Sequence, residues 1–258
     1  MSRVDTSDST RFEFGLDKPL MLRGDWAVTA DWHVPLYDAK LVNKFLDDCS
    51  QRGLTNLIIA GDYLNGDSLS QYYPKQKSAG IDKELREAVS LMNTLAKNFK
   101  QIVFLKGNHD YRYVKSTEYR KDFVTAMKEV FEPVVLDDCR LKFTNLDHVY
   151  LNSNGEKYFI AHPTSYSKNP LSNPISIAEV KKCHTLTAHT HHCAMGWDAS
   201  GSYIVGELGG FFNIPQTEYL QGTTTYPTWC NGYWFIQRGK PEMITYGARG
   251  VKISSKSV

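Results

Sequence analysis

The stretch IVFLKGNHD, residues 102–110, joins an apolar run to a group of polar side chains. Its first four residues are β-branched, aromatic or leucine, as in a buried strand, and Gly107 lets the backbone turn sharply behind them. Asn108 then offers an amide oxygen, His109 a proton donor or acceptor near neutral pH, and Asp110 a carboxylate. Ligands of open α/β sheets bind at the carboxyl ends of the strands. The stretch therefore predicts a buried strand that ends in a polar site.

The same design repeats along the first half of the chain. Apolar runs at 26–30 and 57–60 predict two more buried strands. Apolar residues at helical spacing predict helices from Asp38 and from Asp82, with Asp82 as a cap, and a third helix over 119–131. This alternation of strand and helix implies parallel strands joined by right-handed crossovers.

The second half of the chain predicts a different arrangement. Strands are expected over 141–151, 158–161 and 185–188, and a short helix over 175–182. Turn residues at 154–155 separate the first two of these strands. We therefore expect an α/β fold in which a second, mixed sheet packs on the first.

Length and composition indicate one globular domain. The 258 residues are 41% hydrophobic and 22% charged, which is ordinary for a globular protein. We expect a flexible arm over residues 1–22 and a single domain over 23–258, because no repeat, linker or low-complexity segment divides the chain. The formal charge of +2 is too small to attract nucleic acid by bulk electrostatics.

The sequence also bears on cellular location. It has no apolar core of a secretion signal near its start and no run of membrane-spanning length, so a membrane is not an expected partner. The five cysteines form an odd, scattered set, which indicates reduced thiols rather than a disulfide framework. We therefore expect a cytoplasmic protein, of undetermined oligomeric state.

Five segments place metal-type ligands just past a predicted strand. In chain order they are Asp31-x-His33, Gly61-Asp62, Gly107-Asn108-His109-Asp110, His162, and His189-Thr190-His191. In the first and the last, alternate spacing puts both side chains on one side of an extended backbone. Carboxylates, imidazoles and one amide oxygen suit Mn²⁺, Fe or Zn²⁺ better than Ca²⁺, and the lack of thiolates argues against structural zinc. The set is large enough for two ions.

The order and separation of these motifs resemble those of the calcineurin-like metallophosphoesterases. That family carries D-x-H, GD, GNH[DE], a lone H and GHxH, and the match runs from Asp31 to His191. The resemblance implies a two-sheet mixed β-sandwich flanked by helices, with a dinuclear metal site at the loops between the sheets. The runs at 61–67, 107–112 and 189–192 are also similar to those of small phage and prophage metallophosphoesterases. A phage-encoded protein would act in the host cytoplasm.

The resemblance implies a role for each motif residue. The first ion is expected on Asp31, His33, Asp62 and His191. The second is expected on Asp62 as a bridging ligand, Asn108, His162 and His189. Mn²⁺ is the expected metal, with Fe, Zn²⁺, Ni²⁺ and Mg²⁺ as alternatives. His109 matches a catalytic histidine that binds no metal, contacts phosphate and helps the leaving group depart.

One motif departs from the pattern of the Ser/Thr phosphoprotein phosphatases. Those enzymes carry GDxxDRG, whose aspartate orients the catalytic histidine and whose arginine binds phosphate. Asn65 and Gly66 stand at these two positions here. Asp110 and then Asp67 are the candidates for orienting His109, and we count Asp110 with His109 as catalytic.

Without that arginine the chain resembles the branch of the family that contains phosphodiesterases and the double-strand-break repair nucleases, which carries GNHD and no arginine after GD. The resemblance implies phosphodiesters of nucleotides or nucleic acid as substrates. The alternative is a phosphomonoesterase acting on a nucleotide, a small molecule or a phosphoprotein. A third hypothesis is a non-catalytic scaffold, and the complete set of ligands argues against it. Asn108, His109 and Arg112 are expected to contact the substrate, although packing explains Arg112 equally well. The tyrosines and lysines at 72–77 fit either base stacking or an ordinary loop, and His192 is expected to pack rather than bind metal.

Overall fold

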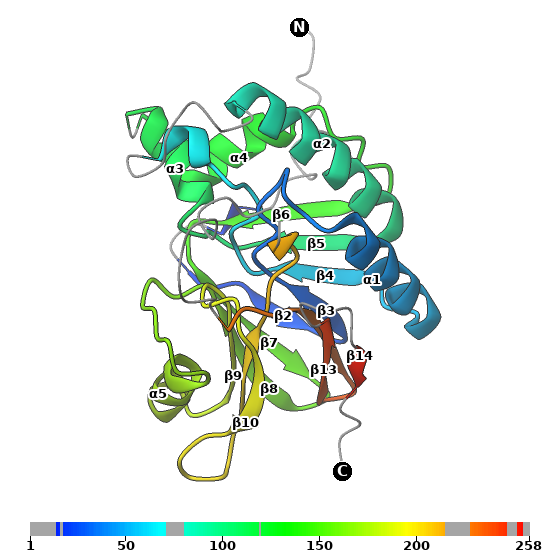
Figure 1. Ribbon diagram of the computed structural model, residues 1–258. Helices are drawn as coiled ribbons and strands as arrows, with labels where there is room; N and C mark the ends of the chain where they lie inside the picture. Colours follow the sequence, from blue (N-terminus) through cyan, green and yellow to red (C-terminus); the bar gives the residue numbers. More distant parts are fainter. Residues whose placement is uncertain are drawn as a thin grey trace, which may run out of the picture.

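Two β-sheets form the centre of the molecule, and helices cover their outer faces (Figure 1). The structure is a computed structural model. It describes residues 14–15, 18–70, 80–118, 120–214, 228–246 and 252–254. The stacking loop expected at 72–77 lies outside the described residues.

The first sheet has eight strands. In spatial order they are β1 (Phe14–Gly15), β6 (Arg140–Thr144), β5 (Gln101–Phe104), β4 (Asn56–Ile59), β3 (Trp26–Thr29), β12 (Asn231–Gln237), β13 (Lys240–Tyr246) and β14 (Lys252–Ser254). The strands from β1 to β3 run parallel to one another, and β12, β13 and β14 continue the sheet with antiparallel pairings.

The second sheet has six strands and is mixed. In spatial order they are β10 (Cys193–Trp197), β11 (Ile204–Leu208), β9 (His184–Thr187), β8 (Glu156–Ala161), β7 (His148–Ser153) and β2 (Met21–Arg23). The β11–β9, β9–β8 and β7–β2 pairs are parallel, and the other two pairs are antiparallel.

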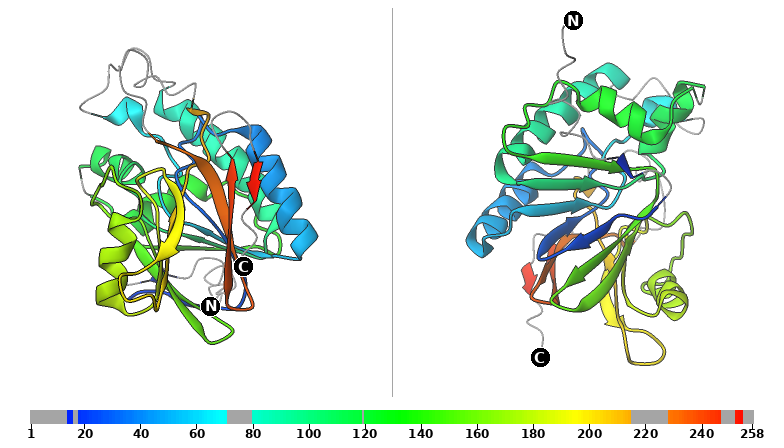
Figure 2. Two further views of the ribbon diagram at one scale, coloured as in Figure 1. Left: turned by 60° about the horizontal axis from the view of Figure 1, so that its bottom comes forward. Right: turned by 180° about the vertical axis from the view of Figure 1, so that it is seen from behind.

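The helices form the outer layers of the sandwich (Figure 2). They are α1 (Ala39–Arg52), the short 3₁₀ helix η2 (Asp67–Leu69), α2 (Ile81–Asn98), α3 (Asp110–Ser116), α4 (Phe123–Phe131) and α5 (Ser172–Lys181). Helices α1, α2 and α4 cover the outer face of the first sheet, and α5 covers that of the second. The layers therefore run helix, sheet, sheet, helix.

The parallel strands are buried on both faces, and β4 shows how. Leu57 and Ile59 pack in the cluster formed with the helices, while Ile58 packs in the cluster between the sheets. All three side chains are fully buried, which explains why this strand is an unbroken apolar run. The α/β two-sheet fold predicted from the sequence is confirmed.

One predicted strand is wrong. The segment 141–151 forms two strands, β6 and β7, and these belong to different sheets. Polar side chains bend the chain between them: Thr144 Oγ1 accepts the Leu146 amide at 3.1 Å, and Asn145 Oδ1 accepts the Val124 amide at 3.1 Å. The apolar alternation is interrupted at this bend, because Leu146 is the one apolar residue between Phe143 and Val149, and the prediction overlooked this interruption.

Two helix boundaries also differ from the prediction. Helix α2 begins at Ile81 after Gly80, so Asp82 lies in the first turn and is not the cap. The helix expected over 119–131 begins only at Phe123. Asp122 ends the preceding segment because its side chain accepts a first-turn amide at 2.8 Å and so caps α4.

Part of the expected N-terminal arm belongs to the sheets. Residues Met21–Arg23 form β2 against β7, so a loose arm does not extend to residue 22. A single domain over 23–258 stays a prediction. Within the described part of the chain, no helix combines the length and the apolarity that crossing a membrane needs. All five cysteines are free thiols.

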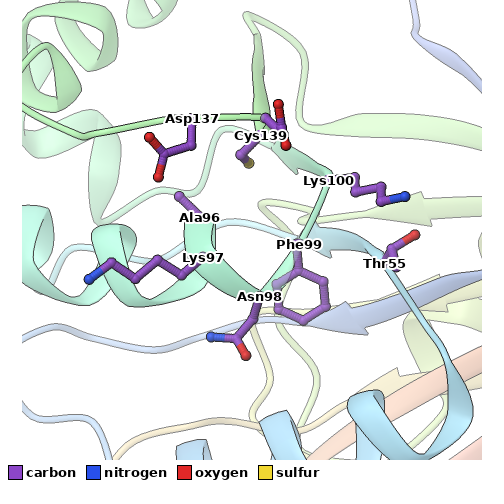
Figure 3. Close-up of a pocket in the computed structure, with 9 residues that line it drawn as sticks. Thr55, Ala96, Lys97, Asn98, Phe99, Lys100, Asp137 and Cys139 are labelled. Atoms are coloured by element: carbon purple, nitrogen blue, oxygen red, sulfur yellow. The ribbon is translucent and has the colours of Figure 1, made fainter.

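A pocket of about 380 Å³ opens at the ends of three strands of the first sheet (Figure 3). Its lining includes Thr55, Lys100 and Cys139, which directly precede β4, β5 and β6. The pocket therefore lies at the amino ends of these strands, opposite the ligand motifs, and we assign it no function.

Candidate active site

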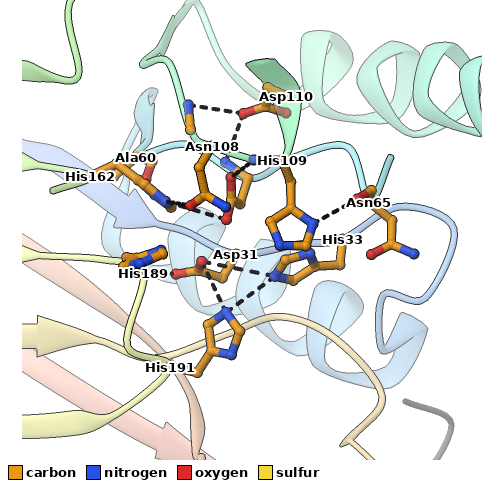
Figure 4. A network of polar contacts seen from close by, with 12 residues as sticks. Asp31, His33, Ala60, Asn65, Asn108, His109, Asp110, His162, His189 and His191 are labelled. Atoms are coloured by element: carbon orange, nitrogen blue, oxygen red, sulfur yellow. Dashed lines mark hydrogen bonds and ion pairs between the residues drawn. The ribbon is translucent and has the colours of Figure 1, made fainter. Parts of the chain in front are cut away.

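The ligand motifs converge in space although they are spread over the chain (Figure 4). Asp31 and His33 follow β3, Asp62 follows β4, and residues 108–110 follow β5. His162, His189 and His191 follow β8 and β9 of the other sheet. Both sheets thus contribute the carboxyl ends of parallel strands to one site, the usual place for ligands in α/β folds.

Asp31, His33 and His191 form the first ligand cluster. Asp31 Oδ1 lies 3.2 Å from His191 Nε2 and 3.9 Å from His33 Nε2. The Nε2 atoms of the two histidines are 3.2 Å apart (Figure 4). All three side chains are buried, so their ligand atoms face one another rather than water.

Asp62, His162 and His189 form the second cluster, with Asn108 beside them. His162 Nε2 lies 3.3 Å from Asp62 Oδ2 and 3.0 Å from Asn108 Oδ1. The other ring nitrogen, Nδ1, donates to the Ala60 carbonyl at 2.9 Å, which directs Nε2 at the cluster. Ligand atoms of the three clustered residues all lie within 4.8 Å of one another.

Asp62 belongs to two groups of potential ligands. A carboxylate oxygen of Asp62 lies within 4.8 Å of the ligand atoms of His162 and His189. The Asp62 carboxylate also forms a group of the same size with His33 and His109. It therefore lies between the two clusters, as a bridging ligand must.

The donor atoms fit divalent cations. Asp31 Oδ1 and Asp62 Oδ2 are buried oxygens that accept no hydrogen bond, an arrangement that is costly unless a positive charge lies nearby. When His33 and His191 are both neutral and each ring carries its proton on Nδ1, neither of the two facing Nε2 atoms can donate a hydrogen bond to the other. Carboxylate, imidazole and amide oxygen are ligands that Mn²⁺, Fe and Zn²⁺ accept.

Burial and neighbouring charges set the protonation of these ligands. Burial, together with His109 and His191, holds the pKa of His33 well below its usual range. Burial raises the pKa of Asp62, but His162 and His109 outweigh this effect and hold that pKa well below its usual range. Metal ligands bind in their deprotonated forms, so both shifts suit a metal site.

Five of the seven expected ligands have a left-handed backbone conformation. Their φ angles are 52° at Asp31, 47° at His33, 52° at Asp62, 79° at His189 and 58° at His191. Such residues each cost on the order of 1–3 kcal/mol and persist only where the surrounding structure holds them in place. Strain of this kind is typical of ligand-binding sites.

Gly107 is needed for a close approach rather than for the shape of the turn. A Cβ atom there would lie 2.1 Å from the Asp62 nitrogen, 2.3 Å from Asp62 Oδ1 and 2.9 Å from Asp110 Oδ2. The GNHD turn therefore packs directly against the residue that bridges the clusters.

His109 faces the clusters and is held at both ring nitrogens. Its Nδ1 donates to the main-chain carbonyl of Asn65 at 2.6 Å, and its Nε2 lies 3.2 Å from Arg112 Nη2. Its ring centroid is 4.5 Å from that of His33 (Figure 4). Burial lowers the pKa of His109; the Asp62 carboxylate opposes this shift and the Arg112 guanidinium adds to it.

Arg112 lies beside His109 and keeps an open side. Its Nη1 pairs with Asp67 Oδ1 at 3.0 Å and donates to the Asn65 carbonyl at 3.1 Å. About a quarter of the side chain, 24%, stays exposed. An oxyanion at the clusters would therefore meet the guanidinium and His109 Nε2 together.

Asp110 does not orient His109, which corrects our expectation. Its Oδ2 accepts the amides of Asp62 at 2.7 Å and Gly107 at 3.2 Å, and its Oδ1 accepts the Leu64 amide at 2.8 Å. Both oxygens are thus taken by main-chain donors. Burial, and then the charge of Asp62, raise the pKa of Asp110 to about 8. Asp110 fixes the two loops that carry the ligands, and a catalytic role for it stays a prediction.

We expect Asp110→Asn to destabilise the metal-free protein by roughly 2–3 kcal/mol, because the new amide turns an NH₂ group toward main-chain donors. Metal affinity should fall as well, since the Asp62 main chain loses its acceptor. Denaturant unfolding and metal titration measure the two effects. Full stability in this variant would contradict the three-amide assignment.

Glu84 of α2 is a second buried carboxylate near the site. Only 3% of the residue is exposed, and its Oε1 accepts the Gly66 amide at 2.7 Å. Burial raises the pKa of Glu84 to about 7, against the opposing effect of the Gly66 hydrogen bond. In the unfolded chain the same carboxyl has its ordinary, lower pKa.

This raised pKa makes stability depend on pH. Between the ordinary pKa and about 7 the folded protein keeps the Glu84 proton that the unfolded chain has lost, so stability falls as pH rises through this window. We expect wild type to lose about 2–3 kcal/mol relative to Glu84→Gln between pH 5 and pH 8, measured by denaturant unfolding of metal-free protein. A difference that does not change with pH would contradict the assignment.

Two further residues support the ligands, and sequence reasoning missed the second of them. Phe212 packs edge-on against His33 and His191, with ring centroids 5.1 and 4.8 Å away. Glu207 is fully buried on β11 and accepts the Thr190 hydroxyl at 2.7 Å beneath the last motif. Its one sequence signal is a single carboxylate inside an apolar strand.

His192 packs away from the clusters, as expected. Its Nδ1 lies 3.3 Å from Glu207 Oε2, and its Nε2 lies 3.1 Å from Thr228 Oγ1. The ring therefore supports the loop of the last motif from the side opposite the ligands.

An α/β sandwich with two clusters of potential metal ligands at its strand ends defines a candidate metalloprotein. The model of the family of calcineurin-like phosphoesterases matches residues 26–206 of the sequence. This chain therefore belongs to the calcineurin-like phosphoesterases. No curated protein matches the sequence significantly.

Solved structures with a similar fold include Yfce, a phosphoesterase from E. coli. It is 13% identical, with a TM-score of 0.46 over 89% of this chain and 97% of that one. Vps29 from Chaetomium thermophilum is 8% identical, with a TM-score of 0.49 over 91% and 97% of the two chains. Wild-type Vps29 from Entamoeba histolytica, complexed with Zn²⁺, is 12% identical, with a TM-score of 0.48 over 90% and 97%. At such values the family match, and not these structures, places the chain.

Proposed function

We propose that this protein is a dinuclear metal-dependent phosphoesterase that hydrolyses phosphodiester bonds of nucleotides or nucleic acid. The observation that carries the proposal is the position of Asp62 between two ligand clusters, with a buried oxygen that accepts no hydrogen bond. Asp31, His33 and His191 would hold one ion with Asp62, and Asn108, His162 and His189 would hold the other with it. Mn²⁺ is the proposed metal, ahead of Fe, Zn²⁺, Ni²⁺ and Mg²⁺.

When bound, two such ions would polarise the phosphoryl group and lower the pKa of a water molecule between them. The residues of the chain supply the remaining functions. The Asn65 carbonyl accepts a hydrogen bond from His109 Nδ1, so Nε2 is the ring nitrogen left to face the leaving oxygen. When the ring is the doubly protonated imidazolium, Nε2 gives its proton to that oxygen and Nδ1 keeps its own. Arg112 offers charge to a non-bridging oxygen beside that nitrogen.

Phosphomonoesterase activity is the second candidate, and Arg112 is the observation that favours it. The arginine that the phosphoprotein phosphatases place after their GD motif is absent from the sequence, but Arg112 brings a guanidinium to the candidate acid from α3. A guanidinium at that place suits the second negative charge of a monoester. The diester proposal rests on the absence of the motif arginine. The single, partly exposed guanidinium of Arg112 is not enough to reverse that preference.

A substrate panel separates the candidates. Metal-free protein is reconstituted with Mn²⁺, and kcat/KM is measured for bis-p-nitrophenyl phosphate and for p-nitrophenyl phosphate. The proposal expects the diester to be preferred. A strong preference for the monoester would establish the second candidate instead. No hydrolysis of either ester by metal-replete protein would support a non-catalytic scaffold.

A further inference from the structure

The imidazole of His109 is oriented by a turn and not by a carboxylate. The acceptor of its Nδ1 proton is the Asn65 main-chain carbonyl, at 2.6 Å. The same carbonyl accepts Arg112 Nη1 at 3.1 Å. One peptide group thus fixes both side chains that face an incoming phosphoryl oxygen.

The turn at residues 65–67 is braced by side chains on either side of its central peptide. Asn65 Nδ2 donates to Asp67 Oδ2 at 2.8 Å, and the other Asp67 oxygen pairs with Arg112 at 3.0 Å. Gly66 has φ 63°, and a Cβ there would lie 3.1 Å from the His109 oxygen and 3.2 Å from Arg112 Cδ. The turn therefore has one compatible residue at its centre and little freedom to shift.

Glu84 is the anchor of this turn. It accepts the Gly66 amide at 2.7 Å from the first turn of α2, which is otherwise part of the outer helix layer. A carboxylate with 3% exposure is expensive to bury, and no metal ligand contacts Glu84 through a hydrogen bond in the described part of the chain. Its position is explained by the turn that it holds.

We propose that Glu84 is a positioning residue: by holding the Gly66 amide it sets the Asn65 carbonyl against His109 Nδ1, and so fixes the tautomer and aim of the proton donor. The inference rests on the proposed function, in which the bond from phosphorus to the leaving oxygen breaks as the Nε2 proton of the His109 imidazolium moves to that oxygen, which leaves the neutral ring protonated on Nδ1. Substrates that release an alkoxide, such as a ribose hydroxyl, depend on this proton. Esters that release the stable p-nitrophenolate anion depend on it much less.

Two substitutions at Glu84 test the inference. Glu84→Leu fills the space but removes the acceptor, whereas Glu84→Gln keeps an acceptor oxygen. Glu87→Leu is the matched control, because Glu87 lies on the same helix and, among the residues that the structure describes, makes only an exposed ion pair with Lys83 at 3.9 Å. Each variant is assayed with two phosphodiesters that differ in the leaving group. One releases p-nitrophenolate, and the other releases an alkoxide.

We expect Glu84→Leu to lower kcat for the alkoxide ester by about 10- to 100-fold, and for the p-nitrophenyl ester by no more than about 3-fold. KM and bound metal should not change, and Glu84→Gln should restore most of the activity. An equal loss for both esters, or a loss of bound metal, would overturn the inference by reducing Glu84 to a structural role.

A second measurement does not depend on activity. In metal-free protein with ¹⁵N-labelled histidine, the ring nitrogens of His109 report which of them carries the proton. Wild type and Glu84→Gln should show protonated Nδ1, and Glu84→Leu should show a mixture of tautomers. An unchanged tautomer in Glu84→Leu overturns the inference. If wild type hydrolyses no phosphoester, the proposed function fails, while this spectrum still decides the role of Glu84.

Discussion

Asp62→Asn is expected to lose both metal ions and turnover together. The Asp62 carboxylate lies between the two ligand clusters, and its Oδ2 is buried without a hydrogen bond. An asparagine keeps one neutral oxygen and turns an NH₂ group toward positions that cations would occupy. Removing a residue that only supports a metal ligand already costs about 10- to 100-fold, so we expect a loss of turnover beyond 100-fold.

Metal content by atomic emission and kcat with added Mn²⁺ measure the effect. Asp47→Asn, the same change on an exposed residue of α1, serves as the control and should keep both ions and full activity. Two tightly bound ions with full activity in Asp62→Asn would exclude a bridging role for this carboxylate.

His109→Gln is expected to reduce turnover by about 10²- to 10⁴-fold for alkoxide leaving groups and to keep both ions, because glutamine cannot give up a proton. His109 lies close enough to His33 and Asp62 to be considered a metal ligand. Two contacts argue against that role: Nδ1 is taken by the Asn65 carbonyl, and the Arg112 guanidinium lies 3.2 Å from Nε2. A cation on Nε2 would lie beside that positive charge.

The comparison of leaving groups separates an acid from a ligand. Loss of an ion together with equal damage to p-nitrophenyl and alkoxide esters would make His109 a ligand and refute its role as the acid. A loss confined to poor leaving groups, with metal content unchanged, is the result that the geometry predicts.

The site was predictable where chemistry lies in side chains that directly follow strands. Asp31, Asp62 and Asn108 each follow an apolar run, and the carboxyl ends of parallel strands share one edge. The structure brings all seven expected ligands together there. Their assignment to two ions stays a proposal.

The support of the site was not predictable in the same way. Every residue has a carbonyl, so the sequence gives no sign that the one at Asn65 holds His109. A carboxylate next to a histidine suggests a pair, yet Asp110 faces main-chain amides because the turn directs it away from the ring. Glu84 lies 18 residues after Gly66, on helix α2, and its contact with the turn appears only in the folded molecule.

The fold shows the same division. Apolar runs with helical or strand spacing identified most elements, since burial on both faces leaves an obvious mark in the sequence. The break between β6 and β7 lies in the polar run 144–148, where only Leu146 is apolar. The run marks an interruption, but the turn into the other sheet, in which Thr144 and Asn145 accept main-chain amides, appears only in the structure.

The two-sheet origin of the ligands has a consequence for how the molecule stays assembled. Asp31 and His191 stand at the ends of different sheets and are separated by 160 positions in the sequence numbering, and the His33–His191 contact spans 158. An ion bound by both residues would cross-link two points that are far apart in the sequence and so close a very long loop. Like a distant covalent cross-link, it would restrict the conformations of the unfolded chain. Metal affinity and the stability of the packing between the two sheets are then linked. A substitution that weakens the packing will lower metal affinity, and a loss of metal will lower the stability of the packing.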